Sequence, residues 1–313
     1  HKYFEHSYLG TDSIDKTKRT SIKNTIGIAL QEGFNKWAKA GLTAFLSYEY
    51  RNFALTDTTN IPGQRIINNY KESSLSIGGE LSKKQGKLLH YNILGELAIA
   101  GEDAGQFSVE GRGDLNLRLF GDTVRLDVNA FIKNQNPVFY FRHFQSKHYW
   151  WDNNDLSKIM RTRLEGKLSL NRWGTQLRAG VENIKNYTYL ANASIPVKDS
   201  EGNVTGFKNN AAVRQHSGNI QIFTAMLQQK LKVGIFHLDG EVAYQKSSEQ
   251  DILPLPELSA YGNLYMKFGL AKKVLQIEMG ADVRYFSKYY APDYSPVIGQ
   301  FYNQNPDDKI EIG

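Results

Sequence analysis

Charged side chains recur at every second position along several segments of the chain. Over positions 105–119, the even positions include Glu110, Arg112, Asp114 and Arg118, whereas the odd positions carry only Gly, Phe, Val and Leu. This spacing places the charges on one face of a β-strand and the apolar side chains on the other. Charges that line a channel can select ions, and charges of mixed sign can also simply pair with each other. The sequence leaves both roles open.

Equivalent segments elsewhere extend this set of candidate pore-lining residues. The complete set is Glu110, Arg112, Asp114, Arg118, Arg125, Asp127, Arg161, Arg163, Glu165, Arg178, Glu182, Glu278, Asp282 and Arg284. If the set forms a filter, exchange of Arg112 and Arg118 for Glu should shift the reversal potential of the channel. Side chains that only pair with each other would leave the reversal potential unchanged.

The densest aromatic stretch covers positions 139–151. Its rings could fold inward as a constriction or stack a sugar at the surface, and they could equally pack a long loop against the rim of a barrel. The residues concerned are Phe139, Phe141, Phe144, Trp150 and Trp151, with His143 and His148 between them. The oxygen-rich segment 152–155 that follows suits a Ca²⁺ ion or, with its spacing, a solvated turn.

Catalytic motifs are absent from the sequence. It has no phosphate-binding loop, dinucleotide fingerprint, nucleophile elbow or paired-histidine metalloprotease motif, and it has no cysteine. We therefore expect no enzyme activity, no cofactor and no metal. The net charge is +6, but lysine and arginine are spread thinly along the 313 residues, which argues against nucleic-acid binding.

Period-two alternation predicts twelve strands. It is clearest at positions 38–51, 105–119, 124–133, 159–170 and 275–285. Weaker runs fill the gaps at 22–32, 70–82, 88–100, 174–187, 217–231, 234–247 and 258–270. Short turns alternate with a second class of links between strands. This second class lies at 52–69, 101–105, 134–157, 188–216 and 248–257, and all of these links except 101–105 are long. A meander with one tight end and one elaborate end is typical of outer-membrane barrels.

These features predict an all-β, antiparallel, up-and-down transmembrane β-barrel that forms a single domain. A soluble β-sandwich also has one apolar face, but its strands usually have about 5–6 residues, whereas a strand that crosses a bilayer needs about 9–11. Aromatic residues near the predicted strand ends also favour a membrane, as such rings prefer the headgroup region; they include Trp37, Trp173, Tyr48, Tyr187 and Tyr285. Unpaired sheet edges are costly in lipid, so we expect the sheet to close.

The strand count places both ends of the chain beside the long links. Intact barrels of this class normally keep both ends at the periplasmic side. We therefore expect the chain to be part of a larger barrel, with at least one further strand at each end and fourteen or more strands in all.

Three segments resemble the putative porin family of the Bacteroidetes. They are Leu253–Tyr265, Gly280–Tyr294 with Pro296, Gln300 and Phe301, and His148–Asn153. The resemblance implies a barrel in the outer membrane of a Gram-negative bacterium, in contact with its lipid, that lets small hydrophilic solutes diffuse passively. A barrel that does not conduct, and instead scaffolds a partner or binds surface glycan, is the alternative. The sequence leaves self-association and envelope protein partners open.

Overall fold

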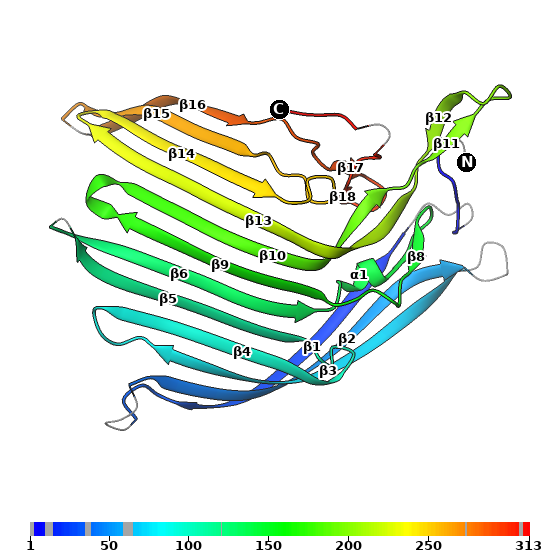
Figure 1. Cartoon of the computed structure of the whole chain (residues 1–313), viewed down its shortest axis with the longest axis horizontal. Coiled ribbons are helices and arrows are strands. Elements are labelled where there is room, and N and C mark those ends of the chain that lie inside the picture. The colour runs from blue at the N-terminus through cyan, green and yellow to red at the C-terminus, as the bar shows by residue number, and fades with distance from the viewer. Residues whose placement is uncertain are drawn as a thin grey trace.

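The computed structural model describes residues 3–9, 15–34, 39–58, 65–119, 121–272, 274–306 and 309–313, without the side chains at positions 58, 65 and 122. Twelve antiparallel strands follow one another across a single sheet, which curves into an open trough (Figure 1). In sheet order they are β1 (Thr17–Leu30), β2 (Gly41–Thr58), β3 (Arg65–Lys83), β4 (Leu89–Gly101), β5 (Phe107–Leu119), β6 (Asp122–Gln135), β9 (Ile159–Leu170), β10 (Thr175–Asn192), β13 (Ala211–Val233), β14 (Phe236–Ser247), β15 (Leu258–Leu270) and β16 (Leu275–Phe286). The predicted all-β meander of twelve strands is confirmed.

The smaller elements lie at the end of the sheet that carries the longer loops (Figure 1). The link from β6 to β9 contains the short helix α1 (Phe139–Arg142) and a hairpin of β7 (His143–Gln145) and β8 (Trp150–Asp152). Two more hairpins are β11 (Ile195–Lys198) with β12 (Val204–Lys208) and β17 (Asp293–Ser295) with β18 (Gln300–Tyr302). At the opposite end, a 3-10 turn, η1 (Asn171–Trp173), joins β9 to β10. None of the described helices is long and apolar enough to cross a membrane.

Strand register brings the predicted pore-lining charges to one face of the sheet. Arg112 lies opposite Asn129, which lies opposite Glu165, so these side chains point to the same side. This polar face is also the one that α1 covers, because Arg142 of α1 pairs with Glu72 of β3. We call it the inner face.

The opposite, outer face carries the apolar stripes. Large side chains there are open to the surroundings: Leu46 is 46% exposed, Leu164 53% and Val283 67%. A second layer of protein would bury such residues, as in a soluble sandwich. Single exposed apolar residues are ordinary, but a continuous band of them around a sheet marks a surface made for an apolar environment.

Closure of the sheet is not observed. β1 pairs only with β2, and β16 only with β15, so within the described residues the two edge strands do not meet. The structure is therefore a curved, open sheet, and the predicted barrel is not confirmed.

Several strands run further than predicted at the loop end. The links expected at 52–69 and 188–216 are wrong, because β2 and β3 extend to Thr58 and from Arg65, and β10 and β13 extend to Asn192 and from Ala211. Polar–apolar alternation fails there for a physical reason. Phe53 and Leu55 lie on the inner face, 4% and 0% exposed, and pack in a small core with Phe139 of α1. The link expected at 134–157 contains the unpredicted α1, β7 and β8.

Candidate functional site

Ion pairs cross the inner face from β5 to β9. Lys133 Nζ lies 2.6 Å from Glu110 Oε1. Arg125 joins two carboxylates, with Nη2 3.6 Å from Asp114 Oδ1 and Nε 2.8 Å from Asp127 Oδ1. Asp114 and Asp127 lie directly opposite each other, and Arg125 beside them offsets the repulsion between the two carboxylates, so that paired charges of both signs line the wall.

The ion pairs continue across β9 and β10. Arg161 Nη2 lies 2.5 Å from Glu182 Oε1, and Arg163 Nη2 lies 2.5 Å from Glu165 Oε2. Arg178 Nε is 4.0 Å from the other oxygen of Glu165. Both carboxylates are largely shielded, with side-chain exposures of 10% for Glu182 and 13% for Glu165. These five predicted residues thus lie together on one wall, in mutual contact.

Four further predicted residues lie away from this wall, three on the edge strand β16 and one beside a turn. On β16, Glu278 pairs with Lys267 at 2.9 Å, the guanidinium of Arg284 lies 5.5 Å from the centre of the Tyr261 ring, and Asp282 lies opposite Asn263. Arg118 lies opposite Thr123, beside the turn between β5 and β6. These four residues share the inner face but do not join the central ion pairs.

Arg112 lines a basic hollow near the turn end of the sheet, with a volume of about 340 Å³. Its charged lining consists of the cations Lys83, Lys84, Arg112, Arg125 and Lys167, the carboxylates Asp114 and Asp127, and His90. Cations outnumber carboxylates here, so this part of the wall attracts anions.

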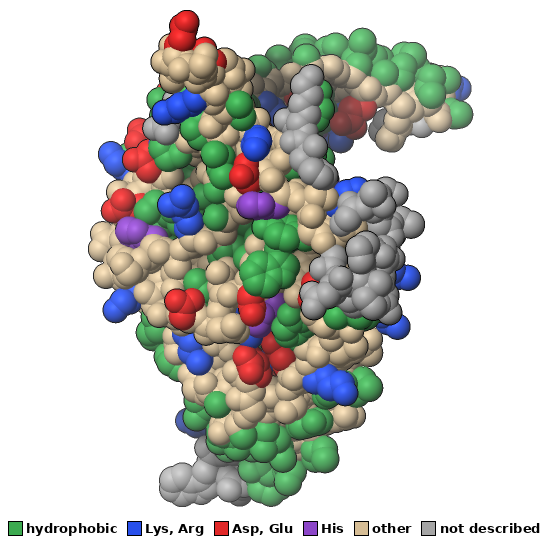
Figure 2. All heavy atoms as spheres, turned by 90° about the vertical axis from the view of Figure 1, so that its right-hand side faces the viewer, with side chains coloured by type: hydrophobic (Ala, Val, Ile, Leu, Met, Phe, Trp, Pro, Cys, Tyr) green, Lys and Arg blue, Asp and Glu red, His purple; other side chains and the backbone are tan. Residues whose placement is uncertain are grey.

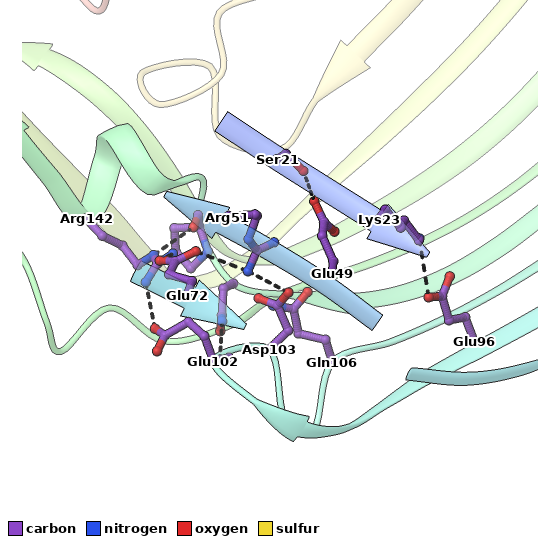
Figure 3. A network of polar contacts seen from close by, with 12 residues as sticks. Ser21, Lys23, Glu49, Arg51, Glu72, Glu96, Glu102, Asp103, Gln106 and Arg142 are labelled. Carbon is purple, nitrogen blue, oxygen red and sulfur yellow. Dashed lines mark hydrogen bonds and ion pairs between the residues drawn. The ribbon is translucent and has the colours of Figure 1, made fainter. Parts of the chain in front are cut away.

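A second charge cluster, which the sequence did not reveal, lies near the loop end (Figure 3). Arg51 of β2 places Nη2 3.1 Å from Glu72 Oε2 and 2.7 Å from Asp103 Oδ2. Arg142 of α1 places Nη2 2.7 Å from Glu72 Oε1 and Nη1 2.8 Å from Glu102 Oε1. Glu72 is 8% exposed, accepts a hydrogen bond from Arg142 and forms an ion pair with Arg51, so it ties α1 to the inner wall.

Backbone geometry explains how the acidic pair of this cluster is placed. Gly101, at the end of β4, has φ +88°, and a Cβ atom there would lie 1.9 Å from the carbonyl oxygen of Ser73. Only glycine fits this turn. The chain then reverses through Glu102 and Asp103, and the amide of Glu102 donates to the carbonyl oxygen of Ser73. Both carboxylates therefore face the arginines of β2 and α1.

The predicted aromatic residues divide into two groups. Phe139 turns toward the inner wall, where its ring stacks on Phe53 with centroids 3.7 Å apart and meets Tyr70 edge-on at 5.5 Å. Phe144 and Trp151 stack on each other at 4.7 Å, across the β7–β8 hairpin. Phe141 is half-buried, and Trp150 is 46% exposed. Only Phe139 joins the core at the inner wall.

The oxygen-rich segment after β8 is used partly in hydrogen bonding. Asp152 Oδ1 lies 2.5 Å from His143 Nδ1, and Asn153 donates to the carbonyl oxygen of Phe141. Within the part of the chain that the structure describes, no group of three or more His, Cys, Asp or Glu side chains could hold a metal ion.

Both terminal segments reach the loop between β6 and β9. The amide of Tyr8 donates to the carbonyl oxygen of Lys147, and Phe4 stacks on His148 at 4.0 Å. Tyr149 is 3% exposed and contacts Ser295 of β17, and burial raises the pKa of its hydroxyl. Seen from the loop end, hydrophobic and histidine side chains gather near the middle of the molecule, with acidic groups beside them (Figure 2). Segments from both ends of the chain therefore pack against the β6–β9 loop at the loop end.

Sequence reasoning missed Arg51, Glu72, Glu102, Asp103 and Arg142. One signal was available. Arg51 is the last residue on the polar face of the predicted strand 38–51, and Glu72 lies on the polar face of the next predicted strand, 70–82. Pairing of neighbouring strands could have brought these two together, whereas the approach of Arg142 depends on the fold of a long loop.

Family comparison agrees with this geometry. A family model described as "Putative porin" matches residues 1–313. The chain belongs to the putative porin family. No curated protein matches it in sequence.

Solved structures resemble this porin-family chain in fold. The siderophore receptor PirA from Pseudomonas aeruginosa has a TM-score of 0.56 and 12% identity, with 88% of this chain and 50% of that chain covered. A chain in the structure of the FpvAI–pyocin S2 complex has a TM-score of 0.50 and 11% identity, with 94% and 41% covered. The chain thus spans half or less of the length of these two proteins.

Proposed function

We propose that this chain forms the wall of an outer-membrane channel in a Gram-negative bacterium, through which small hydrophilic solutes diffuse passively. The observation that carries this proposal is the division of the sheet into two chemically distinct faces. Leu46, Leu164 and Val283 project outward and are exposed, while paired charges such as Arg161 and Glu182 project inward. Lipid suits the first surface and water suits the second.

Membership of the porin family supports the same function. A polar wall remains wet: on the inner face, Arg125 and Asn129 are both exposed. In a bilayer the edges of β1 and β16 need hydrogen-bonding partners, because unpaired backbone groups in lipid cost several kcal/mol each. The proposal therefore includes a closed sheet in the membrane.

Planar-bilayer recording of the purified full-length protein tests the proposal. Discrete current steps in neutral salt, absent from protein-free detergent controls, are the expected result. A protein that inserts into vesicles but passes no current, and admits no hydrophilic dye or sugar in a swelling assay, would contradict passive diffusion.

One observation favours a second candidate, a barrel that does not conduct. α1 and the β7–β8 hairpin pack against the wall and the terminal segments at the loop end, which could leave no passage there. Such a barrel would scaffold a partner or bind surface glycan. Silence in the bilayer, combined with retention of the protein on a glycan array or with a co-purifying envelope protein, would favour this candidate.

A further inference from the structure

The inner wall beside Arg51 contains a polar cavity of about 210 Å³. β1 to β5 and Gln135 of β6 line it with hydroxyl, amide and charged side chains, among them Ser47, Ser74, Glu49 and Glu96. Taking about 30 Å³ for each water molecule in the liquid, this volume equals the share of roughly seven waters. It can hold one small solute.

Ser74 is the residue that marks this cavity as a binding site. Its side chain lines the cavity and is 4% exposed, yet its Oγ has no hydrogen-bond partner among the described residues. Arg51 lines the same cavity, and its Nε atom is also buried without a hydrogen-bond partner among the described residues. Buried donors without acceptors cost free energy, and a bound solute that offers an oxygen atom relieves the cost.

The charges around the cavity decide what kind of solute fits. Carboxylates of Glu49, Glu96 and Asp103 lie beside the cations Lys23 and Arg51. A bound anion would be repelled by the three carboxylates, and a bound cation would be repelled by Lys23 and Arg51. A hydroxyl group can accept a hydrogen bond from Ser74 or Arg51 and donate one to a carboxylate. The cavity therefore favours an uncharged solute with several hydroxyl groups.

An adjoining cavity of about 530 Å³ adds an apolar surface. It shares Arg51, Asp103, Gln106 and Gln135 with the polar cavity and is lined on its far side by the rings of Phe53, Phe139 and Tyr140. Pockets that combine a few placed polar groups with aromatic walls are typical of small-molecule sites. The C–H face of a sugar ring suits such a wall.

We propose that the polar cavity at Ser74 and Arg51 is a binding site for a monosaccharide-sized sugar in its path along the channel. The inference deepens the proposed function, since it names the class of solute that the inner wall recognises. The sugar would donate hydroxyl protons to Glu49 and Glu96 and accept from Ser74, and the cluster around Glu72 would hold α1 beside it.

Binding is measured by NMR titration of glucose onto the detergent-solubilised full-length protein, a readout that does not require conduction. Saturable glucose binding is expected, and Ser74→Ala should weaken it about fivefold, the effect of one lost hydrogen bond of about 1 kcal/mol. Ser169→Ala is the matched control, because Ser169 is also buried on the inner face but lies on β9, away from the cavity. It should bind glucose as the unaltered protein does.

Two results would overturn the site. One is glucose binding that Ser74→Ala and Ser169→Ala leave equally unchanged, and the other is glycine, a zwitterion, binding more tightly than glucose. Bilayer recording separates this inference from the proposed function: a protein that conducts but shows no glucose binding lacks the site and keeps the channel. A protein that binds glucose through Ser74 but does not conduct keeps the site and loses the channel.

Discussion

At the scale of single residues, Glu72 and Arg142 carry the contact on which the loop end depends. Arg142 is the basic residue of a four-residue helix, too short to be stable alone. Two charge-assisted hydrogen bonds, to Glu72 and Glu102, hold it at the wall. These side chains are 13% and 8% exposed at the Arg142–Glu72 contact, so solvent screens the pair far less than a surface ion pair.

Arg142→Ala should release α1 from the wall. If the loop restricts the channel, the single-channel conductance rises and open-channel noise increases, because the loop then fluctuates. The change is measured in planar bilayers at fixed salt. Arg172→Ala, in the exposed η1 turn at the other end of the sheet, serves as the matched control and should leave the conductance unaltered. Equal conductance in all three proteins would show that α1 does not restrict the path.

Phe139 contributes the apolar half of the same contact. It is 6% exposed between Phe53, Tyr70 and Tyr140. Phe139→Ala removes a buried ring, which typically costs about 3–5 kcal/mol. The loss falls on the loop, so protease cleavage within residues 136–158 should accelerate by about 100-fold or more, while the sheet stays resistant. Neighbouring Val138 is 62% exposed, and Val138→Ala should cleave at the original rate.

At the scale of elements, polar–apolar alternation predicts a strand wherever all side chains on one face meet the same environment, such as water on the inner face. The strands between the turns and the loop end were predicted for this reason, including β5 and β9. The part of β2 beyond Arg51 was not, since Phe53 and Leu55 face packed protein rather than water on the inner side. The three hairpins at the loop end carry no such pattern and escaped prediction.

The same logic makes the two faces of the sheet respond oppositely to charge. Leu164 of β9 projects outward and is 53% exposed, while Asn129 of β6 projects inward, opposite Glu165. Leu164→Arg should lower the free energy of unfolding in lipid by about 2–4 kcal/mol, as for an arginine near the bilayer midplane. Asn129→Arg gains a carboxylate neighbour and should change it little. Denaturant titration in lipid vesicles measures both, and equal costs would contradict the outward placement of the apolar stripe.

At the scale of the whole molecule, the inner wall has opposite charge character at its two ends. The cluster at the loop end has more carboxylates than cations, with Glu72, Glu102 and Asp103 around two arginines. The hollow around Arg112 at the turn end has more lysines and arginines than carboxylates. No single-strand pattern predicts this, because each strand mixes both signs and the segregation appears only when neighbouring strands are in register. A permeating ion meets an acidic region and a basic region in succession, so strong selectivity for either sign is not expected.

If the basic charge at the turn end is reversed, the acidic cluster at the loop end should therefore determine the ion selectivity. The double substitution Arg112→Glu with Arg118→Glu reverses charge at the turn end, where Arg112 lies among Lys83, Lys84 and Arg125. The reversal potential in a potassium chloride gradient should move toward the potassium equilibrium potential, and the shift should shrink at high ionic strength as screening increases. Arg172→Glu, a charge reversal in the exposed η1 turn, should leave the potential in place. An unchanged potential in the double variant would mean that the inner charges only pair with each other and select nothing.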